Sequence, residues 1–148
     1  MKIYTSYWAQ VRNFPPNLIA LNTTIFPPKW YKIGGKDKNN VISLHCPPLR
    51  PGKSCNGLCN GKCNPKHPQD CSFLREYRKQ LDTINFSDFI KKLSELNQRF
   101  TTDFPEIIEF NFAFIVFEKY DNPCSEREVI QAWFKDNGFD IQEWHPNT

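Results

Sequence analysis

The segment from Cys46 to Cys71 constrains the fold of this chain more than any other part of the sequence. It holds five of the six cysteines, and three of them recur at every fourth position in the run CNGLCNGKCN. Large apolar side chains are almost absent from this segment, so it cannot build a hydrophobic core of its own. A metal ion or disulfide bonds must therefore order the segment, or it is disordered.

Thiolates and imidazoles are the ligands that zinc prefers, and structural zinc sites close them into a tetrahedron. Four cysteines of the segment are the candidate metal ligands: Cys55, Cys59, Cys63 and Cys71. Three further side chains are substitutes for one of these four: Cys46, His45 and His67. The cysteine spacing departs from that of zinc ribbons and of common iron–sulfur motifs. Ligand type favours structural zinc over an iron–sulfur cluster, while the choice of four thiols stays open.

The sequence carries no mark of export or of membrane insertion. Its first residues, MKIYTSYWAQVRNF, lack the long apolar run of a signal peptide, and the best apolar run, at 110–117, is too short to span a bilayer. We therefore expect a soluble, cytoplasmic protein with no membrane partner. Reducing conditions in that compartment favour a metal over disulfides at a cysteine cluster, with a disulfide-stapled loop as the alternative.

Strand and helix patterns alternate outside the cysteine-rich segment. We expect strands at 2–8, 18–21, 110–117 and 141–144, a short one at 41–44, and helices at 73–81 and 86–100. The run FNFAFIVF at 110–117 lacks polar alternation, which is typical of a central parallel strand buried on both faces. The alternation predicts one three-layer α/β domain over residues 1–148, with a mostly parallel sheet and the cysteine-rich metal-binding loop inserted at about 45–71.

A last helix is predicted after Ser125. The run SERE has the capping-box pattern, a serine at the cap and a glutamate three residues later. The helix should bury Val129, Ala132 and Trp133 and stop at the Asn-Gly pair that follows.

Ligands of parallel α/β sheets bind outside the carboxyl ends of the strands. Cys124 precedes a helix N-terminus, where free amides lower the pKa of a thiol, so it is a candidate nucleophile. Glu118 follows the strongest strand and is a candidate general acid or base. Other polar residues at strand ends are candidate ligand-binding groups: Ser6, Tyr7, Asn22, Thr23, Lys119 and Arg127. The alternative is that Cys124 is a turn residue and Arg127 a surface or salt-bridging group.

Several motifs occur in order along the chain: Ile-Tyr-Thr-Ser-Tyr, a strand running into Pro-Pro-x-Trp, an aromatic-rich helix, an apolar strand ending in Phe-Glu-Lys, and Asn-Pro-Cys-Ser-Glu-Arg-Glu-Val-Ile-Gln-Ala-Trp-Phe. Together they resemble the family called Domain of Unknown Function 488, whose members typically end with an apolar strand, a Glu and a Cys-His-Arg turn. The positions that match are Ser6, Pro27 or Pro28, Glu118 and Cys124.

The chain departs from that family at the turn, where Ser125 and Glu126 stand in place of His and Arg, and Arg127 falls one position later. The cysteine-rich insertion is not a general feature of the family. The resemblance implies a compact Rossmann-like α/β fold with a pocket at the turn between Glu118 and Cys124.

Three functions from different classes fit the sequence. The first, which we favour, is a binding protein for an anionic ligand, a nucleotide or nucleic acid; basic residues near the cysteine cluster support it: Lys29, Lys36, Lys38, Arg50, Lys53 and Lys62. The formal net charge of +3 is too small for the overall field alone to hold nucleic acid. The second is an enzyme that uses Cys124 or Glu118, and the third is an interaction or inhibitory protein with the metal loop as contact surface.

Overall fold

A five-stranded sheet, in which every strand pair is parallel, organises the molecule. The computed structural model describes residues 1–58, 64 and 66–147. Its strands are β1 (Ile3–Tyr7), β2 (Leu18–Asn22), β3 (Ser43–His45), β4 (Asn111–Val116) and β5 (Gln142–Glu143). They lie in the order β3-β2-β4-β1-β5. The expected mostly parallel sheet is therefore parallel throughout these strands, as in Rossmann-like α/β folds.

The expected central strand is confirmed by β4, which pairs with β1 on one side and with β2 on the other. Its side chains alternate between the two faces, and Phe112, Ala113, Phe114 and Ile115 are all 0% exposed. Phe112 and Phe114 belong to one hydrophobic core, while Ala113 and Ile115 belong to a second core across the sheet. The absence of polar alternation in the sequence thus reflects burial on both faces.

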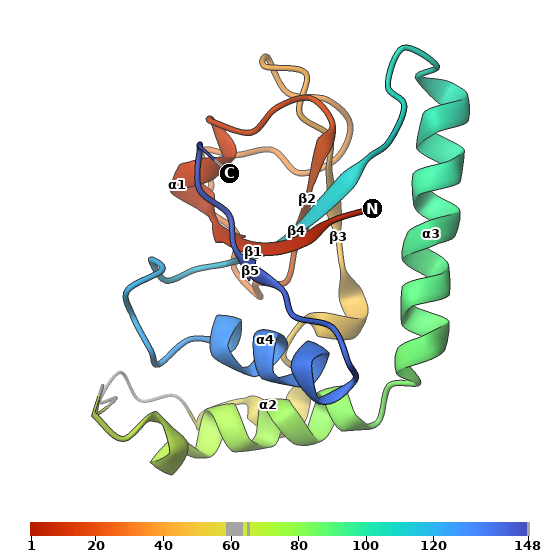
Figure 1. The fold of residues 1–148 in the computed structure, drawn as a ribbon. Helices are drawn as coiled ribbons and strands as arrows, with labels where there is room; N and C mark the ends of the chain where they lie inside the picture. Colours follow the sequence, from red (N-terminus) through yellow and green to blue (C-terminus); the bar gives the residue numbers. More distant parts are fainter. Residues whose placement is uncertain (59–63, 65, 148) are drawn as a thin grey trace.

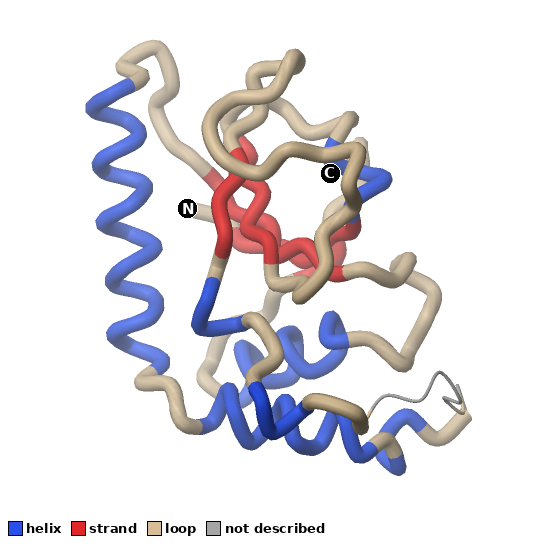
Figure 2. Tube along the Cα trace, turned by 180° about the vertical axis from the view of Figure 1, so that it is seen from behind, coloured by secondary structure: helices blue, strands red, loops and turns tan. Residues whose placement is uncertain are grey.

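Helices cover one face of the sheet. The helices are α1 (Trp8–Val11), α2 (Ser72–Asp82), α3 (Phe86–Asp103) and α4 (Glu126–Asp136), with 3-10 turns η1 (Pro47–Leu49), η2 (Lys53–Cys55) and η3 (Pro68–Asp70). The helices α2, α3 and α4 are drawn in Figure 1, and Tyr77 of α2, Phe89 of α3 and Trp133 of α4 belong to the core that contains Phe114. The one-turn helix α1 and the loop between β2 and β3, where Val41 is buried, cover the opposite face (Figure 2), together with Phe14 and with Trp144 of the C-terminal segment. The layers on the two faces are therefore unequal.

The last helix begins and ends as its sequence predicts. The Ser125 side chain caps α4 by accepting a hydrogen bond from the backbone N–H of Arg127, and Gly138 follows the helix with a φ of 88°. Val129 and Trp133 are buried as expected, but Ala132 is exposed. The prediction for Ala132 is wrong because Ile130 and Phe134, which are larger, occupy the buried face of the helix instead.

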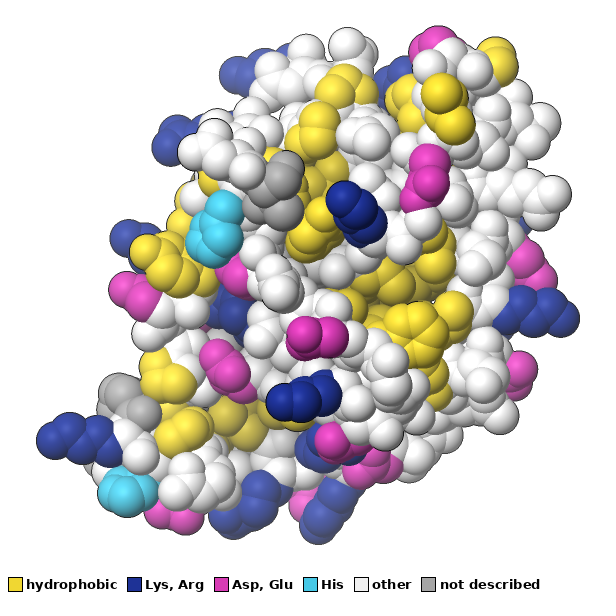
Figure 3. All heavy atoms as spheres, in the orientation of Figure 1, with side chains coloured by type: hydrophobic (Ala, Val, Ile, Leu, Met, Phe, Trp, Pro, Cys, Tyr) yellow, Lys and Arg dark blue, Asp and Glu magenta, His cyan; other side chains and the backbone are white. Residues whose placement is uncertain are grey.

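The surface and the inserted segment complete the fold. No helix in the described part of the chain is both long and apolar enough to cross a bilayer. Acidic and basic side chains are scattered over the face drawn in Figure 3, rather than gathered in one field. The inserted segment enters through η1 and η2 and leaves through η3 into α2, while residues 59–63 and 65 lie outside the described residues.

Candidate functional site

The chain leaves two neighbouring strands, β2 and β4, in opposite directions. From β2 it runs outward to the edge strand β3 through a loop on one face, and from β4 it runs through α4 on the other face to β5. Connections that diverge in this way leave a crevice outside the carboxyl ends of the two strands, and open parallel sheets bind their ligands there. The topology therefore singles out the crevice between β2 and β4.

A cavity of about 350 Å³ opens at this crevice. Six described residues line it: Thr24, Ile25, Phe26, Phe117, Glu118 and Glu126. Two of them, Phe26 and Phe117, are 83% and 70% exposed, although large aromatic side chains are normally buried. The cavity therefore combines exposed aromatic faces with two carboxylates.

The two carboxylates interact directly. Glu126 is hydrogen-bonded to Glu118, and burial together with the charge of Glu118 raises the pKa of Glu126 to about 7. The Ser125 hydroxyl donates a hydrogen bond to Oε2 of Glu118 at 2.9 Å, which holds that carboxylate at the start of α4. With a pKa of about 7, Glu126 is partly protonated near neutral pH and can both donate and accept a proton.

The raised pKa of Glu126 links the stability of the fold to pH. The pKa in the folded protein lies above the ordinary value of 4.5, so the folded state binds a proton that the unfolded state has released. This contribution is fully present below pH 4.5 and is lost as the pH rises to about 7. The pair thus costs the protein stability at neutral and alkaline pH, as expected of groups kept for function rather than for folding.

Arg127 fixes the backbone around the pair. Its side chain is 2% exposed, and its Nε donates to Oε1 of Glu143 at 2.6 Å. Its terminal nitrogens donate to the carbonyl oxygens of Glu118 at 2.7 Å and Lys119 at 2.8 Å. Because these donors are used within the protein, Arg127 joins α4, β5 and the turn after β4, which agrees with the salt-bridging alternative for this residue.

The candidate residues at the end of β2 are buried and bonded to one another. Oδ1 of Asn22 accepts a hydrogen bond from the Thr24 hydroxyl at 2.6 Å, and its Nδ2 lies 3.1 Å from Nδ1 of His45. The Thr23 hydroxyl donates to the carbonyl oxygen of Ile115 at 2.8 Å. Thr24 is the residue of this group that lines the cavity.

The candidates from β1 and the turn after β4 lie beside the cavity rather than in its described lining. Ser6 is completely buried, and its hydroxyl has no hydrogen-bond partner among the described residues. The centre of the Tyr7 ring lies 5.9 Å from the Arg127 guanidinium carbon. Lys119 is exposed. Direct ligand contact by Ser6, Tyr7 or Lys119 stays a prediction.

Cys124 is 8% exposed and immediately precedes the serine that caps α4. Its backbone N–H donates to Oδ1 of Asn122 at 2.9 Å, which fixes the turn. Cys124 is not among the described residues that line the cavity. A nucleophile must reach its substrate, so this position favours Glu118 over Cys124 as the residue that acts on a ligand.

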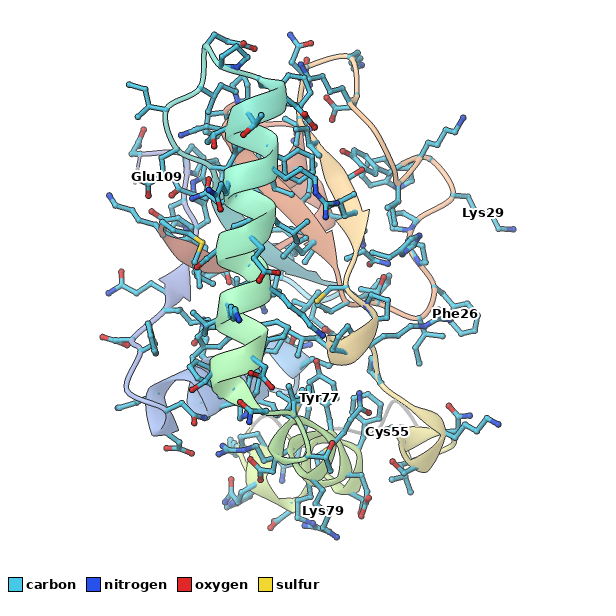
Figure 4. All side chains as sticks on the ribbon, turned by 90° about the vertical axis from the view of Figure 1, so that its right-hand side faces the viewer. Phe26, Lys29, Cys55, Tyr77, Lys79 and Glu109 are labelled. Carbon is cyan, nitrogen blue, oxygen red and sulfur yellow. The ribbon has the colours of Figure 1, made fainter. Side chains whose placement is uncertain are left out.

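The structure describes two of the four predicted metal ligands, Cys55 and Cys71. Cys59 and Cys63 lie outside the described residues. Cys55 is 2% exposed in the core that also contains Tyr77 of α2 (Figure 4), and Cys71 is the residue before the first turn of α2. Burial raises the pKa of the Cys55 thiol, which favours its neutral form in the absence of an ion. The full ligand set therefore stays a prediction.

The structure describes all three substitute ligands, Cys46, His45 and His67, but they do not form one metal-binding group. Burial raises the pKa of the Cys46 thiol to about 12, which disfavours the thiolate that a metal needs. His45 is engaged with Asn22, and His67 lies near Gln69. Within residues 1–58, 64 and 66–147, no three His, Cys, Asp or Glu side chains form a group that could hold a metal ion.

Sequence reasoning missed Glu126 as a site residue. It was noted only as a departure from a family pattern, yet it stands at the far end of the turn that Glu118 opens. A glutamate at the first helical position, facing another at the end of the preceding strand, was the available signal. Phe26 was missed because an aromatic residue near a strand normally indicates core packing. Phe117 was expected inside the buried strand at 110–117, but the strand ends at Val116 and Phe117 is exposed.

Comparisons of the chain with models of protein families, with curated proteins and with solved structures find no match. The resemblance to Domain of Unknown Function 488 therefore rests on the sequence motifs.

We predict that Arg127→Met lowers the free energy of unfolding by about 3–5 kcal/mol, because it leaves the Glu143 carboxylate buried without its partner. Urea denaturation measures this loss. The matched control is Arg78→Met, which removes the more exposed pairs to Asp82 and Asp136 and should cost about 0–1 kcal/mol. Equal losses in the two variants would contradict the role given to Arg127.

We also predict that the purified protein contains about one zinc ion per chain, because the cysteine-rich segment has no core of its own. Elemental analysis measures the metal directly. Cys59→Ser and Cys63→Ser should lose it, whereas Cys124→Ser should retain it. Metal-free wild-type protein, or unchanged metal content in Cys59→Ser, would refute the zinc assignment.

Proposed function

We propose that this chain binds a small uncharged or cationic ligand in the crevice between β2 and β4 and carries out acid–base chemistry on it there. The observation that carries the proposal is the contact between Glu118 and Glu126 at the wall of the cavity, where burial and the charge of Glu118 raise the pKa of Glu126 to about 7. A proton donor and a proton acceptor lie within hydrogen-bonding distance of each other, and the pKa of the donor is close to neutral pH. General acid–base catalysis needs this combination.

The charge of the cavity supports an uncharged or cationic ligand over an anionic one. The charged side chains in its described lining are both carboxylates. Arg127, which follows Glu126 in sequence, already binds Glu143 and two carbonyl oxygens, and Lys119, which follows Glu118, is exposed and not in the described lining. An anion would add to the repulsion that raises the pKa of Glu126. The anionic ligand expected from the sequence thus has little support in this crevice.

The exposed aromatic side chains restrict the class of ligand further. Phe26 and Phe117 offer ring faces on which a planar group can stack, and their rings attract cations. The volume of about 350 Å³ suits a small molecule or one planar group of a larger one. We therefore propose a planar ligand rich in N–H donors, such as an amidine, a guanidine or a protonated heterocycle.

The proposed acid–base chemistry rests on Glu118 rather than on Cys124. Glu118 lines the cavity and accepts a hydrogen bond from Ser125, so it is held as the base, with Glu126 as the acid. Cys124 is buried, and the described lining does not include it. We therefore keep Cys124 as a residue of the turn that positions Ser125 and the first turn of α4.

The remaining expectations are proposals with separate support. The parallel sheet with helices packed on it favours a three-layer, Rossmann-like domain of the Domain of Unknown Function 488 type. The cysteine run favours a zinc-ordered insertion, which offers a surface for a protein partner or an inhibitory contact. A cytoplasmic location rests on the sequence alone. A nucleotide or nucleic-acid partner has its best support at a second surface, around Trp30.

Benzamidine, a planar ring bearing a cation, is the probe that tests the crevice. We predict that its affinity rises about three- to tenfold between pH 5.5 and 8.5, because Glu126 loses its proton near pH 7 and the pair gains a negative charge. Two-dimensional NMR would follow the backbone amides of Phe117, Glu118 and Glu126. Benzoate, the anionic counterpart of the probe, should bind more weakly at every pH.

Glu126→Gln should remove the pH dependence of benzamidine binding. Glu128→Gln changes the net charge equally on the same helix but affects an exposed residue, so it should retain that dependence. Absence of benzamidine binding, or stronger binding of benzoate, would exclude the proposed ligand class. Loss of the pH dependence in both variants would show that the proton of Glu126 is not its source.

A further inference from the structure

A second cavity, of about 590 Å³, lies between α1 and the loop that joins β2 to β3. Its charge is opposite to that of the crevice, because four basic side chains line it beside a single carboxylate. The basic residues are Arg12, Lys32, Lys36 and Lys38, and the carboxylate belongs to Asp37. This cavity is independent of the site proposed above.

An exposed indole forms one wall of this cavity. Trp30 is 70% exposed, and its ring meets the ring of Tyr31 edge-on, with 6.1 Å between centroids. Tyr31 packs in turn on Trp8, with 4.9 Å between centroids, and Trp8 is 4% exposed. The buried Trp8 therefore anchors the base of the aromatic group, while the outer indole stays open to solvent. Such an anchored aromatic face is a platform for stacking a planar ring.

The single carboxylate of the cavity is bound within its own loop. Oδ1 of Asp37 accepts hydrogen bonds from the backbone N–H groups of Asn39 at 2.8 Å and Val41 at 3.0 Å. Its Oδ2 accepts from the Tyr31 hydroxyl at 3.0 Å. The carboxylate is therefore directed at its own loop, which it holds in the shape that presents the neighbouring lysines.

Most of the basic side chains around this cavity have no bonding partner among the described residues. Lys36 lies over the Phe104 ring, with its ammonium 3.9 Å from the centroid. The side chains of Arg12, Lys32 and Lys38 form no ion pair or hydrogen bond with any other residue that the structure describes, and all three residues are exposed. Lys29 also projects from this loop into solvent (Figure 4). Three free cations therefore surround an open aromatic face.

We propose that this surface binds single-stranded nucleic acid, with one base stacked on Trp30 and adjacent phosphates held by Arg12, Lys32 and Lys38. Stacking on an aromatic side chain requires an unpaired base, which a duplex does not offer. Single-strand-binding surfaces combine basic side chains with such a platform. A free nucleotide offers the same base and phosphate chemistry, so the test must separate the two sources.

Binding of an oligothymidylate of twelve nucleotides tests the proposal. The chain has four tryptophans, and the other three, Trp8, Trp133 and Trp144, are at most 6% exposed, so quenching of tryptophan fluorescence reports on Trp30. We expect quenching on binding and a slope of about −2 for log affinity against log salt, as for about three phosphate contacts. Fluorescence anisotropy of the labelled oligonucleotide gives the affinity of each variant.

Trp30→Ala should weaken binding by about tenfold or more, and Lys32→Glu and Lys38→Glu should each weaken it and flatten the salt slope. The matched control is Lys79→Glu, which makes the same charge change on α2, at a side chain that is 74% exposed; it should bind as the wild type does. Circular dichroism confirms that the variants fold. An equal loss in Lys79→Glu would overturn the proposal in favour of a general charge effect.

Three other outcomes would also overturn the proposal. One is the absence of binding at low salt. Another is binding of a duplex of equal length as tightly as the single strand, with no effect of Trp30→Ala, which would indicate attraction by charge alone. The third is binding of thymidine monophosphate as tightly as the oligonucleotide, which would make the surface a site for free nucleotides.

Discussion

The buried ion pair between Arg127 and Glu143 is the interaction on which the crevice depends. It joins the first turn of α4 to β5, and the same guanidinium holds the backbone carbonyls of Glu118 and Lys119. Glu143 also accepts a hydrogen bond from Thr5, so β1 belongs to the same network. A buried cation must find such partners, because an unpaired charge in the interior is costly. The turn after β4 is thereby fixed, and Glu118 faces Ser125 and Glu126.

The molecule carries two surfaces of opposite charge, one at the carboxyl ends of the strands and one on the face that α1 covers. The diverging connections of β2 and β4 open an acidic crevice next to α4, while the loop after β2 forms a basic cavity with an exposed indole. The formal net charge of +3 is a sum over the whole chain and does not reveal this local separation. The short α1 and the long loop leave the second face free for the basic surface, which a full helix would have covered.

The fold was largely predictable from the sequence, and the site only in part. Burial of β4 on both faces followed from FNFAFIVF, and the start of α4 followed from Ser125, because both signals are local. The partner of Arg127 is sixteen positions away, and the pairing of Glu118 with Glu126 depends on how the turn folds back; neither is visible in a local pattern. Ala132 was misplaced because periodicity alone does not fix which of two adjacent faces of a helix is buried.

The central claim is that burial and the neighbouring Glu118 raise the pKa of Glu126 to about 7 at the crevice, and a titration of the Glu126 side-chain carboxyl carbon by ¹³C NMR tests it most directly. The account predicts a midpoint for Glu126 near pH 7, which should fall when Glu118→Gln removes the neighbouring charge. A midpoint for Glu126 near its ordinary value of 4.5, unchanged in Glu118→Gln, would contradict the account, because both carboxylates would then be ionised at neutral pH.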